Sequence, residues 1–239
     1  MPPATAADLV GAIQPLTQLT DRWLKSATLN LFENKVIEPG PAGRAALKRN
    51  PREAAALAVG LLAAPSTAQA GRYALGILGA GRQRGSRIDP HECRHSHELG
   101  KLIEVALSRP YFIDALSVMI QEWKILESGL AYYAGLPTSR GLTGEWKAEL
   151  TVQVWGTPNF GAHIELDVRE VFPLSESGFD QHHTFLGIEA DWLGDATEDL
   201  ESGDPSDVVK RLAHQATHGF DQRVIIALGR RLGERGVDY

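Results

Sequence analysis

The chain has 239 residues, of which 43% are hydrophobic and 23% charged, so it can bury the core of one large domain or of two closely packed ones. A single cysteine, Cys93, excludes an internal disulfide framework and favours a reducing compartment. Residues 1–7 lack the basic and apolar segments of a secretory leader, and no apolar run has the length of a membrane span. We therefore expect a cytoplasmic protein that has no membrane partner.

Charge is distributed unevenly along the chain. Residues 1–100 contain 12 Lys and Arg against 8 Asp and Glu, whereas residues 101–239 contain 12 against 22. This asymmetry indicates either different partners for the two parts or a contact between them.

The first 65 residues predict helices. Apolar residues recur at three- and four-residue steps through residues 6–32, and Pro15 should break this segment into a short helix and a longer one from about residue 17. Pro51 then opens an alanine-rich segment, and we predict a helix of small residues in the core over residues 52–64.

A glycine-rich segment follows, over residues 79–85. Its spacing, Gly79-x-Gly81-x-x-x-Gly85, resembles a loop that binds a dinucleotide at the start of a helix. Pro90 falls where that helix should run, and no alternating series of strands and helices follows, so an ordinary glycine-rich loop is the favoured interpretation.

Arginines gather on and around this loop. The candidate residues for binding phosphate or a nucleic-acid backbone are Arg72, Arg82, Arg84, Arg87 and Arg94. A solvated loop, or one that docks on the acidic second part of the chain, is the favoured alternative.

A further helix is predicted from about residue 89 to residue 108. Asp89 can cap its start, Pro90 suits its first position, and Glu92 completes a capping box. Pro110 then ends the helix.

The start of this helix carries the most specific motif in the sequence, because His91-Glu92-x-x-His95 matches H-E-x-x-H. On a helix, His91 and His95 lie on the same buried face as Leu99. Two imidazoles one turn apart can hold Zn²⁺, and Glu92 can serve as the general base for a metal-bound water. The motif opens the helix and contains Arg94, so hydrogen bonding at a helix start is favoured over a structural metal site or a zinc hydrolase.

Residues 111–134 predict one strongly apolar helix, which we take as the central core helix. After this helix the apolar residues recur at every second position. Residues 146–155 and 162–168 alternate apolar and polar side chains, which predicts a β-hairpin with one buried and one wet face. A third strand is predicted over residues 184–190.

The wet face of this hairpin gathers charged residues. His163, Glu165 and Asp167 line one strand and can hold Mg²⁺. Lys147 and Glu149 would share the same face, so charge pairing between the strands is the favoured account.

Residues 189–207 contain eight Asp and Glu and no Lys or Arg. A solvated acidic loop is favoured, and Ca²⁺ binding is the alternative, although the spacing is not that of an EF-hand.

A long C-terminal helix is predicted from residue 204 or 206 to about residue 232. His214, His218 and Asp221 have the i, i+4, i+7 spacing of one helix face, for which an exposed polar face is the favoured account. If this helix packs beside the one that begins near residue 89, four histidines can close one tetrahedral zinc site: His91, His95, His214 and His218.

We therefore expect an α+β fold: a mainly helical region over residues 1–140, packed on a small antiparallel sheet with a long C-terminal helix over residues 141–239. No complete nucleophile or nucleotide motif is present. The favoured function is a non-catalytic interaction or structural component of a larger assembly, without a cofactor. Its partner would be a protein or a second copy, with nucleic acid as a variant. The alternative is a zinc hydrolase that uses His91, His95 and Glu92.

Overall fold

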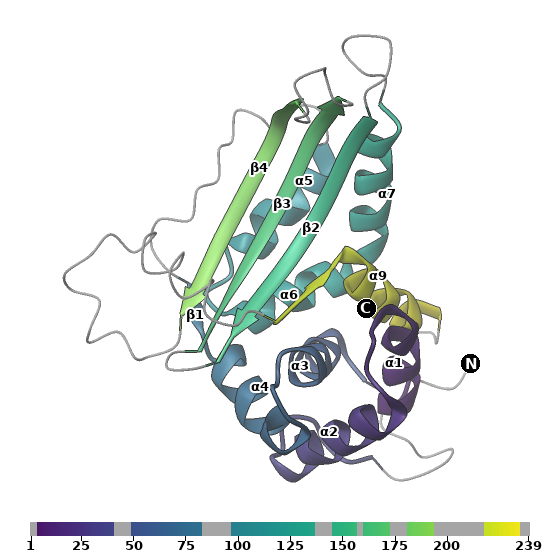
Figure 1. Ribbon diagram of the computed structural model, residues 1–239, viewed down its shortest axis with the longest axis vertical. Helices are drawn as coiled ribbons and strands as arrows, with labels where there is room; N and C mark the ends of the chain where they lie inside the picture. The colour runs from purple at the N-terminus through teal and green to yellow at the C-terminus, as the bar shows by residue number, and fades with distance from the viewer. Residues whose placement is uncertain are drawn as a thin grey trace, which may run out of the picture.

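The computed structural model is an α+β structure, as predicted, with helices packed on a five-stranded antiparallel sheet in the order β1-β4-β3-β2-β5 (Figure 1). It describes residues 4–40, 49–82, 97–136, 145–156, 160–172, 181–193 and 218–234. The elements are α1 (Ala6–Ile13), η1 (Gln14–Leu16), α2 (Asp21–Glu33), α3 (Pro51–Leu62), η3 (Thr67–Gln69), α4 (Ala70–Leu78), β1 (Gly81–Arg82), α5 (His97–Leu107), α6 (Phe112–Gln121), α7 (Trp123–Ala134), β2 (Glu145–Trp155), β3 (Gly161–Phe172), β4 (Gln181–Leu193), β5 (His218–Asp221) and α9 (Gln222–Glu234).

The predicted break at Pro15 is confirmed, because α1 ends before it and α2 begins after it. The start of α1 is fixed by a capping box in which Thr5 accepts from the backbone N–H of Asp8 and the Asp8 side chain accepts in return. The side chain of Thr20 caps α2 in the same way, by accepting from the N–H of Trp23.

Helix α3 lies at the centre of the helical part, with α1, α2 and α4 around it (Figure 1). Its alanines leave room for this close packing, and residues 54–61 are all buried, so the predicted core helix is confirmed. The prediction that residues 111–134 form the central helix is wrong. That segment is two helices, α6 and α7, with a break at Glu122, whose φ of −94° and ψ of 29° are not helical.

Helix α5 ends at Leu107, close to the predicted end. Its buried side chains follow the expected row: Leu99, Leu102, Ile103 and Ala106. The residues that we predict to start this helix, 89–96, lie outside the described part of the chain.

The predicted hairpin is confirmed as β2 and β3, in which Val152 pairs with Ile164. Alternate residues of both strands face α5, α6 and α7 (Figure 1). Those that are fully buried are Leu150, Val152, Val154, Ala162, Ile164, Leu166 and Val168. The third predicted strand is β4, which is longer than expected and pairs with β3 through a register shift between Val168 and Arg169.

The prediction of one continuous C-terminal helix from residue 204 or 206 to about residue 232 is wrong, because residues 218–221 form strand β5 and α9 has only 13 residues. Strand β5 pairs with Thr151–Val154 of β2, so the hydrogen bonds of the sheet decide the conformation there. The Gln222 side chain extends this pairing by accepting from the Leu150 N–H at 3.1 Å. Strand β1 was also not predicted; its Gly81 and Arg82 pair with the end of β4.

Helix α9 packs on α1, α6 and α7. It therefore connects the last part of the chain to both the first helix and the helices behind the sheet. Among the described helices, none combines the length and the apolar character that crossing a bilayer requires.

Candidate functional site: the open face of the sheet

The two faces of the sheet differ in chemistry. One face is apolar and packs on helices, whereas the described helices leave the other face uncovered (Figure 1). We call this second surface the open face. Its described positions are Glu145, Lys147, Glu149, Thr151, Gln153, Trp155, Gly161, His163, Glu165, Asp167, Arg169, Val171, Glu189, Asp191, Leu193, Gly219 and Asp221.

His163 lies between two carboxylates on this face. Its Nδ1 is 2.8 Å from Oδ1 of Asp191 on β4, and its Nε2 is 3.9 Å from Oε2 of Glu165 on its own strand. Burial by itself lowers the pKa of the imidazole, but the contacts with Asp191 and Glu165 outweigh burial and raise the pKa to about 9. The contact with His163 in turn lowers the pKa of Glu165. His163 is therefore a cation at neutral pH.

Arg169 forms the second cluster of the open face. Glu149 and Asp167 are direct register partners on neighbouring strands, so two like charges lie opposite each other. Arg169 bridges this pair, with Nη1 2.8 Å from Asp167 and Nη2 3.3 Å from Glu149. The expected charge pairing between the strands is therefore made by Arg169, which the sequence analysis did not name, whereas Lys147 pairs with Glu145 on its own strand at 3.0 Å.

Glu165 and Glu189 repeat the same arrangement on β3 and β4, where they are also direct register partners. Here no described cation bridges the two carboxylates. Glu165 has His163 on one side, whereas the exposed Glu189 forms no ion pair with a described residue.

The open face is acidic overall. Among the side chains described there, seven are carboxylates and three are cations. The carboxylates are Glu145, Glu149, Glu165, Asp167, Glu189, Asp191 and Asp221, and the cations are Lys147, His163 and Arg169. This balance gives the face a negative field that attracts cationic groups.

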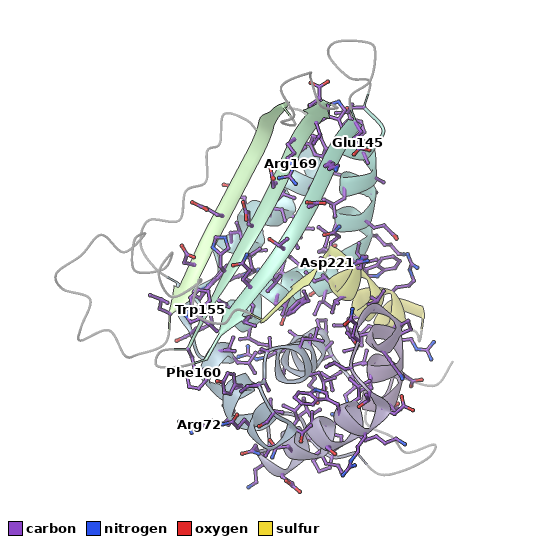
Figure 2. All side chains as sticks on the ribbon, viewed as in Figure 1. Arg72, Glu145, Trp155, Phe160, Arg169 and Asp221 are labelled. Carbon is purple, nitrogen blue, oxygen red and sulfur yellow. The ribbon has the colours of Figure 1, made fainter. Side chains whose placement is uncertain are left out.

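Trp155 marks one end of the open face (Figure 2). Its indole lies over Gly161, because a Cβ at Gly161 would stand 2.4 Å from the ring. The ring is 4% exposed, and its Nε1 finds no hydrogen-bond acceptor among the described residues.

Within the described residues, no group of three His, Cys, Asp or Glu side chains is placed to hold a metal ion. The proposed Mg²⁺ ligands His163, Glu165 and Asp167 are placed as ion pairs instead. Nδ1 of His163 lies 2.8 Å from Asp191, and Asp167 is held by Arg169 at 2.8 Å.

A pocket of about 480 Å³ lies between α1 and α9. Both arginines in its wall already form ion pairs within the chain: Arg231 with Asp8 at 2.9 Å, and Arg230 with Glu127. The rest of its lining is mainly small residues, so the open face offers the richer chemistry.

Most of the predicted site residues lie outside the described part of the chain: Arg84, Arg87, His91, Glu92, Arg94, His95 and His214. The convergence of the histidines and the zinc site therefore stay predictions. The backbone of His218 and Asp221 is in β5 and not in a helix, so the helix face predicted for these two residues is wrong. Arg82 is in β1, and the exposed Arg72 on α4 lies at the other end of the molecule from Glu145 (Figure 2).

Sequence reasoning missed two features of the open face: the contact of Asp191 with His163 and the opposition of Glu189 to Glu165. Both depend on the register of β3 against β4, which the alternation of apolar residues alone does not set. Comparison with known proteins adds no relative, because no family model, no curated protein and no solved structure matches this chain.

Proposed function

We propose that this protein is a non-catalytic interaction component of a larger assembly and that the open face is its binding surface. The observation that supports this most directly is the sheet face that the described helices leave uncovered, with its surplus of carboxylates. A rigid sheet holds such groups at fixed spacings, which suits recognition of a partner more than chemistry on a small substrate.

The proposed partner is a protein or a second copy of this chain, and the proposed location is the cytoplasm. A single cysteine and the absence of a disulfide framework support a reducing compartment. No described residue group favours the zinc hydrolase or the nucleic-acid variant.

Photo-crosslinking tests the proposal. A photoreactive amino acid at Thr151, in the middle of the open face, should give one discrete protein adduct in cells, while the same group at the exposed Lys25 on α2 should not. The partner identified by mass spectrometry should then form a complex with the purified chain. If this partner is a second copy, light scattering should give a mass that rises with concentration.

Two results would contradict the proposal. One is a chain that stays monomeric and gives no adduct at Thr151. The other is one zinc ion per purified chain that is lost, together with a hydrolytic activity, in His95→Ala. Heparin retention that disappears in Arg82→Glu would point instead to nucleic acid.

A further inference from the structure

The open face contains one acidic pair that a cation of the chain bridges and one whose two carboxylates no described cation bridges, although Glu165 also contacts His163. Glu149 and Asp167 are opposed across β2 and β3, and Arg169 bridges them. Glu165 and Glu189 are opposed in the same way across β3 and β4, and no described cation bridges them.

We propose that an Arg or Lys side chain from a partner protein occupies the position between Glu165 and Glu189, and that it bridges these carboxylates as Arg169 bridges the neighbouring pair. This inference rests on the proposed function and specifies its partner as a protein segment rich in Arg or Lys.

The local chemistry supports a cation at this position. Carboxylates directly opposite each other on neighbouring strands repel, and a guanidinium removes that repulsion because it can donate to both. The contact with His163 lowers the pKa of Glu165, so this carboxylate is ionised at neutral pH. Glu189 is exposed, so an incoming side chain can reach it.

The surroundings favour a segment of protein over a single small cation. Glu165 lies in a row across the sheet in which Thr151 and Asp221 also face the open side. A segment with Arg at alternate positions matches the two-residue repeat of side chains along each strand.

The experiment measures the fluorescence anisotropy of a labelled hexapeptide that alternates Arg and Thr, with a Gln-for-Arg peptide as the control. Glu189→Gln should weaken binding by about tenfold, whereas Glu145→Gln, which removes the same charge at the far end of the face, should weaken it less than about twofold. Glu189→Arg supplies the missing cation from within the chain, so it should abolish binding and raise the melting temperature.

Three outcomes would overturn the inference: equal losses in Glu189→Gln and Glu145→Gln, unchanged binding in Glu189→Arg, or equal competition by spermine, which would indicate a simple counter-ion site. The experiments distinguish failure of this inference from failure of the proposed function. A partner crosslinked at Thr151 whose complex is insensitive to Glu189→Arg contradicts only the inference, whereas the absence of any partner contradicts the proposed function.

Discussion

His163 donates from Nδ1 to the carboxylate of Asp191 across 2.8 Å, and this contact joins β3 to β4 on the open face. The raised pKa of His163, about 9 against an ordinary value of 6.5, makes this contact dependent on pH. A group whose pKa is higher in the folded state stabilises the fold fully below its unfolded pKa, and this stabilisation disappears as the pH rises through the folded value.

We expect the free energy of unfolding to fall by on the order of 3 kcal/mol between about pH 6 and about pH 10, since one pKa unit corresponds to about 1.4 kcal/mol. In His163→Gln, this pH-dependent contribution to the free energy of unfolding should be absent. Urea denaturation of both proteins across this range gives the comparison. A fall of the same size in His163→Gln would show that other groups titrate instead.

Helix α9 crosses α6 so closely that Gly229 has no room for a side chain. A Cβ there would stand 2.3 Å from the carbonyl oxygen of Ile120, which is backbone and cannot move aside cheaply. Gly229→Ala should therefore destabilise the protein by about 2 kcal/mol or more. Gly11 on α1 has no atom within 4 Å of its Cβ position, so Gly11→Ala should instead stabilise by up to about 1 kcal/mol. If Gly229→Ala and Gly11→Ala changed the melting temperature equally, this expected difference between the two glycines would be contradicted.

Two neighbouring arginines at the start of α3 form ion pairs in different surroundings. Arg49 is 3% exposed and binds Glu53 at 2.7 Å, while Arg52 is 65% exposed and binds Asp114. Arg49 also donates to the carbonyl of Glu38. Arg49→Met should cost about 3 kcal/mol because it breaks a buried network, and Arg52→Met less than about 1 kcal/mol. Denaturant midpoints measure both, and a larger loss in Arg52→Met would refute this ranking.

The start of α4 is capped from another helix. Asn30 on α2 accepts from the N–H of Gly71 at 2.8 Å, and α4 has no side-chain cap of its own. Asn30→Ala should lose about 1 kcal/mol. Asn30→Asp should keep the contact and gain a few tenths of a kcal/mol at neutral pH, because a carboxylate is favoured at a helix N-terminus. Thermal melts at neutral and acidic pH test this, since the gain should disappear once the new carboxylate is protonated.

The elements that could be predicted are those whose pattern is local. The alternation in residues 146–155 sets which side of β2 is buried, and the small residues after Pro51 mark the helix that fits at the centre. Strand β5 could not be predicted in this way. The apolar residues Phe220, Val224 and Leu228 have helical spacing, but the N–H and C=O groups of β2, about 70 residues earlier, hold residues 218–221 in the sheet.

The candidate site was predictable only in part, because some of its contacts depend on how β3 pairs with β4. The sequence places His163, Glu165 and Asp167 on one wet face, which the structure confirms. It does not reveal that Glu165 meets Glu189, because the shift between Val168 and Arg169 changes the pairing of β3 with β4.

The packing of α3 has a consequence for how the chain acquires its structure during synthesis. This central helix contacts α1 and α2, but also α6 and α9, so its burial needs segments from both ends of the chain. While the ribosome is still making the later residues, the apolar sides of α1 and α3 have no cover from α9. The newly made N-terminal part must therefore keep these sides from aggregating until Gln222–Glu234 emerges and completes the enclosure.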